Sequence, residues 1–89
     1  MAEGIVTAPP FVNRLIAALT QQLPGSEVHT EHVRAERFRF VIVWSQFDAM
    51  DHPERQQLVW DIAERELAPQ ELRNVSMILT LGDEDLPQS

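Results

Sequence analysis

The sequence contains no cysteine, no lysine and only three glycines among its 89 residues. Without thiols, the chain cannot form disulfides, cysteine-ligated zinc sites or an iron-sulfur cluster bound by its own sulfur atoms. It also lacks both common glycine-rich phosphate-binding loops. Any redox chemistry must therefore come from a partner.

Basic residues are also scarce. Fourteen acidic side chains against seven arginines give a net charge of -7, and such a field repels phosphate backbones and anionic membranes. No apolar run approaches the roughly 20 residues that span a bilayer, and residues 1–10 lack the basic and apolar parts of a secretion signal. The sequence favours a cytoplasmic protein with protein partners, no nucleic acid and no membrane, and it leaves the oligomeric state open.

The length of the chain suits one domain without a deep catalytic cavity, because so short a chain buries only about 60–65% of its unfolded surface. Residues 1–8 are expected to form a flexible lead-in, residues 9–82 the domain, and residues 83–89 a flexible acidic tail. The sequence therefore predicts a single compact unit.

Hydrophobic periodicity predicts the first half of this domain. Apolar residues at three-four spacing over 11–23 predict a helix, which begins after Pro9-Pro10 and ends at Pro24-Gly25. Mixed β-branched and charged residues over 26–33 predict an edge strand. The run over 37–44 becomes continuously apolar, which predicts a central strand that is exposed at its start and buried on both faces beyond it.

The second half begins with a helix start signal. Asp51 and Glu54 have the spacing of a capping box for a helix that runs to about Leu67. A short helix over 70–74 and a last strand over 75–81 follow. The whole order predicts an α+β domain of αββααβ topology, with a three-stranded mixed sheet and helices on one face.

Few side chains suggest chemistry. His29 and His32 are weak candidates for metal ligands, because residues three apart in a strand point to opposite faces. Glu64 and Glu66 diverge on a helix and suit a solvated surface better than acid-base work. No nucleophile and base can be brought together, so the chain is expected to be non-enzymatic.

The predicted topology is also that of type II KH domains, which bind RNA through a GXXG loop between two helices. Here the corresponding junction, residues 67–70, has no glycine and has acids on either side. Both the motif and the charge therefore disfavour RNA binding.

The segment from Phe47 to Leu67 resembles the BolA family, whose members share the KH-like topology without the GXXG loop. In that family, a phenylalanine after the central strand is followed nine residues later by a histidine in an Arg-His-Arg-Leu-Val-Tyr-like segment, and an acid-leucine pair closes the helix. This chain has Phe47, then Arg55-Gln56-Gln57-Leu58-Val59-Trp60, then Glu66-Leu67. The resemblance extends loosely over residues 11–81, and it implies a BolA-like fold.

BolA-like proteins are partners of monothiol glutaredoxins and share a [2Fe-2S] cluster with them, to which the helix histidine contributes. Gln56 occupies that position here, and Ser76 aligns with a histidine that often opens the last strand. The resemblance therefore implies a protein-interaction module, with a monothiol glutaredoxin as the implied partner, that holds no cofactor and does not ligate the cluster directly. The candidate partner-binding residues are Phe47, Arg55, Gln56 and Trp60.

A second hypothesis is an adaptor or small subunit of a larger assembly. Such a protein would dock through the exposed edge of the strand at 26–33 or through the acidic tail. The sequence does not identify the partner or the pathway.

Overall fold

The computed structural model describes residues 9–86, and it confirms the predicted αββααβ order. Residues 1–8 and 87–89, which belong to the predicted lead-in and tail, lie outside the described part. Two short 3-10 helices, η1 and η2, add to the predicted elements. The elements are α1 (Pro10–Gln22), β1 (Glu27–Arg34), β2 (Arg37–Val43), η1 (Ser45–Ala49), α2 (His52–Glu66), α3 (Pro69–Leu72), β3 (Val75–Leu81) and η2 (Asp83–Asp85).

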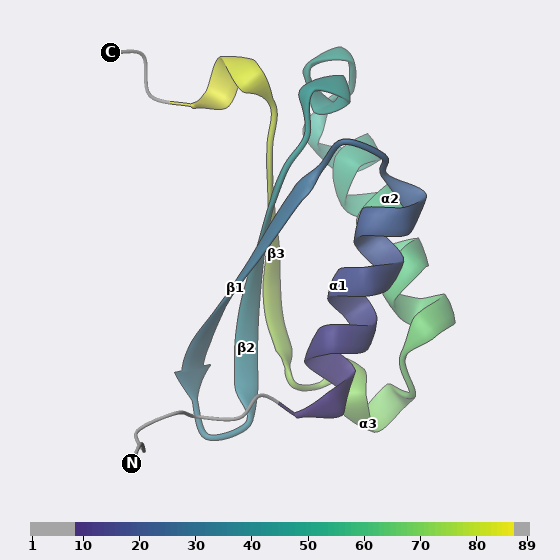
Figure 1. Ribbon diagram of the computed structural model, residues 1–89, viewed down its shortest axis with the longest axis vertical. Coiled ribbons are helices and arrows are strands. Elements are labelled where there is room, and N and C mark those ends of the chain that lie inside the picture. The colour runs from purple at the N-terminus through teal and green to yellow at the C-terminus, as the bar shows by residue number, and fades with distance from the viewer. Residues whose placement is uncertain (1–8, 87–89) are drawn as a thin grey trace.

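The three strands form one mixed sheet in the order β1-β2-β3 (Figure 1). β1 and β2 are antiparallel, and β2 and β3 are parallel. β2 is therefore central and β1 lies at an edge, as the sequence predicted. β3 forms the other edge.

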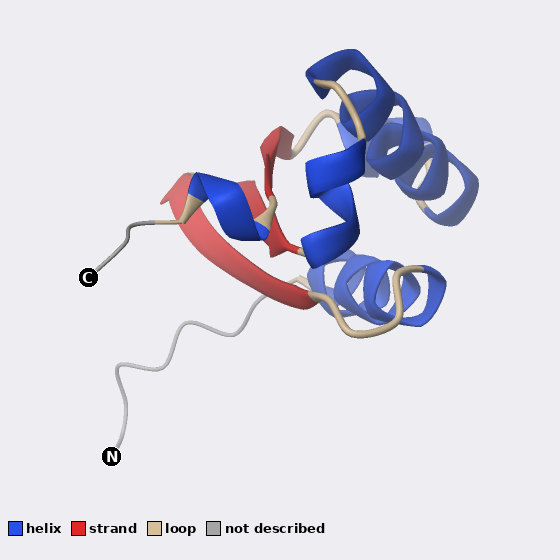
Figure 2. Ribbon diagram, turned by 90° about the horizontal axis from the view of Figure 1, so that it is seen from above, coloured by secondary structure: helices blue, strands red, loops and turns tan. Residues whose placement is uncertain are grey.

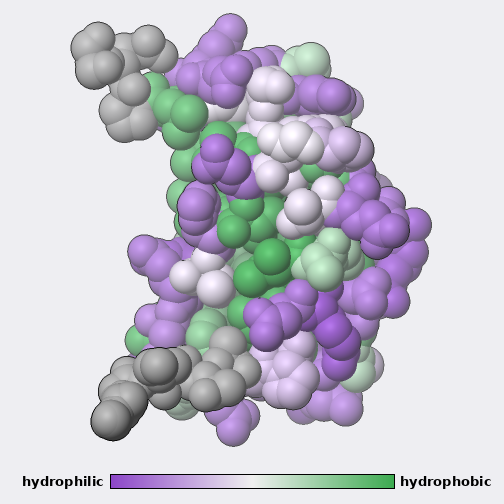
Figure 3. All heavy atoms as spheres, in the orientation of Figure 1, coloured by the Kyte–Doolittle hydropathy of each residue, from purple (hydrophilic) through white to green (hydrophobic). Residues whose placement is uncertain are grey.

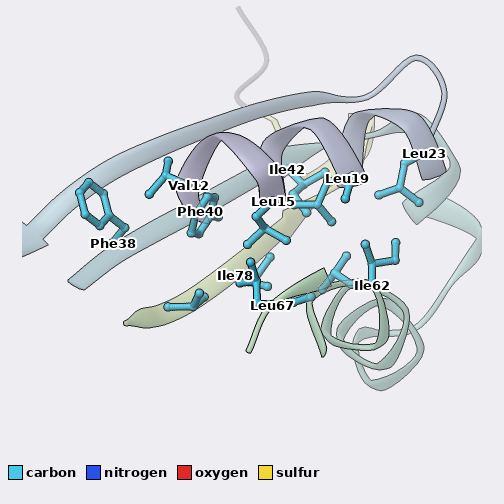
Figure 4. Close-up of a cluster of buried hydrophobic side chains, with 14 of the residues drawn as sticks. Val12, Leu15, Leu19, Leu23, Phe38, Phe40, Ile42, Ile62, Leu67 and Ile78 are labelled. Atoms are coloured by element: carbon cyan, nitrogen blue, oxygen red, sulfur yellow. The ribbon is translucent and has the colours of Figure 1, made fainter. Parts of the chain in front are cut away.

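Both long helices lie on the same side of the sheet (Figure 2). The side chains that β2 turns toward them, Phe38, Phe40 and Ile42, are buried. Apolar residues of α1 and α2 pack against these side chains in the core (Figure 4). Figure 3 shows hydrophobic side chains gathered between the strands and α1, with hydrophilic ones around them. The predicted packing of the helices on one face is confirmed.

The central strand differs from the prediction in one respect. Burial alternates along β2 to its end, and Val41 and Val43 are only half-buried. The prediction that β2 is buried on both faces is therefore wrong, because within residues 9–86 both long helices, α1 and α2, pack on the same face of the sheet (Figure 2). A continuous apolar run does not distinguish a strand covered on both faces from one covered on a single face.

The start of α2 agrees with the predicted capping box. The Glu54 N–H donates to Asp51 Oδ1 at 2.9 Å, and the Asp51 N–H donates to Glu54 Oε1 at 3.1 Å. These two bonds satisfy backbone donors that have no partner inside the helix. At the end of α1, Gly25 takes a φ of +88°, which only glycine adopts without strain.

A short helix follows the predicted domain boundary at residue 82. Asp83–Asp85 form η2, which packs next to η1 at one end of the sheet (Figure 1). The first three residues of the predicted tail thus contact the rest of the described structure. Within residues 9–86, no helix is long and apolar enough to cross a membrane.

Candidate functional site

Gln56 lies where α2 meets the free edge of β3. Its Nε2 atom donates a 2.9 Å hydrogen bond to the carbonyl oxygen of Ile78. Because β3 pairs with β2 on one side only, alternate carbonyls of β3 point away from the sheet. The Gln56 amide therefore occupies an acceptor that an added strand would otherwise use.

The other end of the Gln56 amide is also engaged. Trp60, one helical turn further along α2, donates from its indole Nε1 to Gln56 Oε1 at 3.1 Å. Both side chains are half-buried, and Trp60 packs against the edge of the core. The two hydrogen bonds fix the orientation of the amide, with its nitrogen toward β3 and its oxygen toward Trp60.

Arg55 lies deeper than expected of a contact residue. Its side chain is only 8% exposed, and its guanidinium forms a 2.9 Å ion pair with Asp85 of η2. The same guanidinium donates to the carbonyl oxygens of Met50 at 3.1 Å and Thr80 at 3.4 Å. Arg55 thereby joins the start of α2, the edge of β3 and η2.

The charge of Arg55 also changes the titration of its partner. The Gly82 N–H and the Arg55 guanidinium donate hydrogen bonds to the Asp85 carboxylate and hold its pKa below the ordinary value of 3.8. The Asp85 carboxyl group therefore remains ionised at neutral pH. Its ion pair with Arg55 connects η2 to α2.

Phe47 contacts the Arg55 side chain from inside the core. Its ring is fully buried, and the Arg55 guanidinium carbon lies 5.7 Å from the ring centroid, within the range of a cation-π contact. Trp44 packs edge-on against the same ring. Of the four candidate partner-binding residues, Phe47 is thus fully buried, and the polar atoms of Arg55 form hydrogen bonds inside the domain.

Asp48 of η1 contacts η2 at the same end of the sheet. Its Oδ1 atom accepts a hydrogen bond from the Glu84 N–H at 3.1 Å. A Cβ atom at position 82 would overlap the Asp48 carboxyl group, although the φ of Gly82 is an ordinary -90°. Glycine is therefore required at position 82 because the chain passes close to Asp48, and not because its backbone conformation is unusual.

The histidines lie away from Gln56, on β1. His29 pairs with Val41 in register, and its Nε2 lies 3.4 Å from Glu27 Oε1. His32 stacks on the ring of Phe38, and its Nε2 lies 2.6 Å from the carbonyl oxygen of Ala35. The two side chains thus have separate surroundings, and among residues 9–86 no group of three His, Cys, Asp or Glu side chains could hold a metal ion.

Gln56 and Ser76, the two positions that the sequence resemblance aligned with histidines, both donate hydrogen bonds to backbone carbonyls. The amide nitrogen of Gln56 donates to a carbonyl, and Ser76 Oγ donates to the carbonyl oxygen of Phe38 at 3.2 Å. Both side chains thus bind backbone carbonyls of the sheet and stabilise its edge and its register. The outer face of α2 has a shallow, open depression lined by Asp61, Glu64 and Arg65, and none of the four candidate residues lines it.

Comparison with known proteins identifies the fold. No protein-family model and no curated protein matches the sequence. Among solved structures, BolA1 from Arabidopsis thaliana is similar, with a TM-score of 0.65 and 22% sequence identity over 93% of this chain and all of that one. The chain is thus a BolA-like α+β domain, as the segment from Phe47 to Leu67 predicted.

Sequence reasoning placed all four candidate residues near one another but missed Asp85 and Gly82. Asp85 is 30 positions from Arg55, and a single acid in an acidic tail gives no sign of a distant partner. Gly82 is the last residue of the predicted domain, and a single glycine gives no sign of the side chain that it approaches. No local pattern in the sequence could have revealed either role.

Proposed function

We propose that this chain is a non-enzymatic protein-interaction module of the BolA type that binds a monothiol glutaredoxin without ligating the shared cluster itself. The observation that carries the proposal is the BolA-like fold with Gln56 bound at the edge of β3. A neutral amide is a poor cluster ligand, and here both ends of the amide already have hydrogen-bond partners.

The proposed contact surface is the exposed part of Gln56 and Trp60 on α2. Phe47 and Arg55 support this surface from inside, since they fix the start of α2 against β3 and η2. A half-buried tryptophan with a polar indole edge is a common anchor at protein interfaces. The module would therefore recognise its partner through this surface, and the partner would supply the ligands of the cluster iron.

The test mixes the full chain with a monothiol glutaredoxin that carries a [2Fe-2S] cluster. Complex formation is followed by size-exclusion chromatography, and the cluster environment by visible circular dichroism. The proposal expects a complex whose spectrum does not change in the variants His29→Ala and His32→Ala. Gln56→His, which restores the family's ligand type, should alter the visible spectrum.

Two results would count against this proposal. A cluster spectrum that depends on His29 or His32 would show that this chain supplies a ligand after all. If neither the wild-type chain nor Gln56→His formed a complex, a monothiol glutaredoxin would be excluded as the partner. Trp60→Ala, with Gln57→Ala as an exposed control on the same helix, tests the contact surface itself.

A second candidate function is an adaptor that docks through the free edge of β1. The eight residues of β1 pair with β2 on one side only, and within residues 9–86 no other strand pairs with their outward edge. The edge is favoured over the acidic tail because Asp85 already binds Arg55. Hydrogen-deuterium exchange of a purified complex discriminates the two: edge docking protects the amides of β1, whereas the BolA-type surface protects those of α2 near Trp60.

A further inference from the structure

The face of the sheet opposite the helices is apolar along β2 and β3. Val41, Val43 and Leu81 are half-buried there, and Met77 and Leu79 remain 44% and 42% exposed. The register places these side chains next to one another, since Val41 pairs with Leu79 and Val43 with Leu81. Adjacent exposed apolar side chains mark interaction surfaces more often than scattered ones do. We refer to these five residues as the open-face patch.

Across the sheet, the face changes from apolar to charged. β1 contributes Glu27, His29 and Glu31 to the same face, next to the valines of β2. Arg39 of β2 forms an ion pair with Glu31 on this side. The half of the face toward β3 is thus apolar, and the half toward β1 is charged.

Along the strands, the two ends of the face carry opposite charge. The end where β2 and β3 finish is acidic. Its acids are Glu27, Asp83 and Glu84. The opposite end, at the β1-β2 turn, carries Arg34 and Arg37 around one acid, Glu36. The face therefore changes from apolar to charged across the strands, and from acidic to basic along them.

We propose that the open-face patch docks against the same patch of a second copy of this chain, with the strands of the two sheets running in opposite directions. A two-fold axis that is perpendicular to the strands and lies between the sheets places β3 over β3. The apolar halves then meet, and the acidic end of each face covers the basic end of the other. Two sheets packed in this way lie about 10 Å apart with strands aligned within about 30°.

The charge pattern excludes the other two-fold arrangement. An axis parallel to the strands would place β1 of one copy over β3 of the other, and the acidic ends would meet. Charged side chains would then cover the apolar patch, and like charges would face each other. The face is therefore complementary to itself in one orientation only, which is the argument for a second copy as the occupant.

The dimer should be weak. Three strands spaced about 4.8 Å apart, each about 23 Å long, offer a footprint of only about 330 Å² on each copy, which is smaller than that of stable specific interfaces. The net charge of -7 also opposes association at long range. We therefore expect a weak dimer that forms only at high protein concentration. The patch lies on the face opposite α2, so this inference goes beyond the proposed function and can fail or succeed independently of it.

Sedimentation equilibrium of the full chain over a range of concentrations tests the inference. We expect a monomer-dimer equilibrium that the double variant Met77→Thr/Leu79→Thr weakens at least about tenfold. Threonine keeps the β-branched shape that strands prefer, and circular dichroism verifies the fold. Ala17→Thr on the exposed side of α1 is the matched control and should dimerise as the wild type does. A wild-type chain that stays monomeric, or a double variant that dimerises equally well, overturns the inference.

Charge reversal tests the orientation. Glu27→Arg and Arg37→Glu should each dimerise more weakly than the wild type, because each places like charges at the ends of the interface. An equimolar mixture of the two variants should recover dimerisation, since both end contacts in the mixed pair then join an arginine to a glutamate. Recovery at low salt that fades at high salt supports the antiparallel arrangement. A mixture no better than either variant alone overturns it.

Discussion

Gln56 and Ile78 are 22 positions apart in the sequence, yet the side-chain amide of one donates a 2.9 Å hydrogen bond to the backbone carbonyl of the other. This contact joins α2 to the free edge of β3. Gln56→Leu keeps the size of the side chain but leaves the Ile78 carbonyl and the Trp60 indole without this partner. We expect a loss of about 1–2 kcal/mol in the free energy of unfolding, measured by urea denaturation.

Two further variants make this prediction specific. Gln57→Leu, at an exposed neighbouring position, should change stability little. Gln56→Glu keeps an acceptor for Trp60 but turns a carboxylate toward the Ile78 carbonyl, so it should destabilise more than Gln56→Leu at neutral pH. Equal stabilities of Gln56→Leu and the wild type would show that the amide contributes nothing to the edge.

Gly82→Ala should destabilise the fold by about 1–3 kcal/mol, because the added methyl group overlaps the Asp48 carboxyl group. A double-mutant cycle with Asp48→Ala identifies the cause. In the Asp48→Ala background, the same substitution at Gly82 should cost less, since the carboxyl atoms are gone and only the backbone nitrogen of residue 48, 3.0 Å from the added Cβ, stays close. An equal cost in both backgrounds would point to the backbone of η2 instead.

The pH dependence of stability should depend on Asp85. Its pKa in the folded state is lowered by the Gly82 N–H and by Arg55. A carboxyl group of this kind stabilises the fold above its ordinary pKa, and the contribution is lost as the pH falls through the lower, folded-state value. Asp85→Asn should therefore lower the free energy of unfolding at pH 7, and its effect should decrease as the pH falls below 3.8.

The control for this experiment is Asp61→Asn, which removes one acid from the exposed side of α2. This substitution changes the net charge by the same amount as Asp85→Asn, but it removes no contact to Gly82 or Arg55. Urea denaturation over this pH range gives the comparison. If Asp85→Asn and Asp61→Asn behave alike across the pH range, the ion pair with Arg55 does not stabilise the fold.

The capping box at the start of α2 gives a fourth prediction. Asp51→Ala removes the acceptor for the Glu54 N–H and should reduce the free energy of unfolding by about 1 kcal/mol. Asp51→Ser, which retains a capping oxygen, should recover most of the loss. Far-ultraviolet circular dichroism during urea denaturation provides the measurement, and an unchanged midpoint for Asp51→Ala would contradict the prediction.

Local patterns in the sequence were sufficient to predict the three α-helices and three strands of this fold, but not η1 and η2. The three-four spacing over residues 11–23, the proline and glycine that follow it, and the pair Asp51 and Glu54 act within one or two turns of chain. Such interactions are encoded by residues close in sequence, so α1, α2 and the strand order could be predicted. The motif from Phe47 to Leu67 likewise predicted the BolA-like fold.

Only the tertiary structure decided what the side chains of α2 do and which surfaces remain open. The buried position of Arg55 depends on Asp85 and Thr80, and the orientation of Gln56 depends on Ile78, all far away in sequence. The helix-free face of β2 likewise follows from where α1 and α2 pack, which a run of apolar residues does not specify. Contacts between distant segments are set by the whole chain, and for that reason the sequence indicated the fold of this protein while the structure showed which of its residues are available for binding.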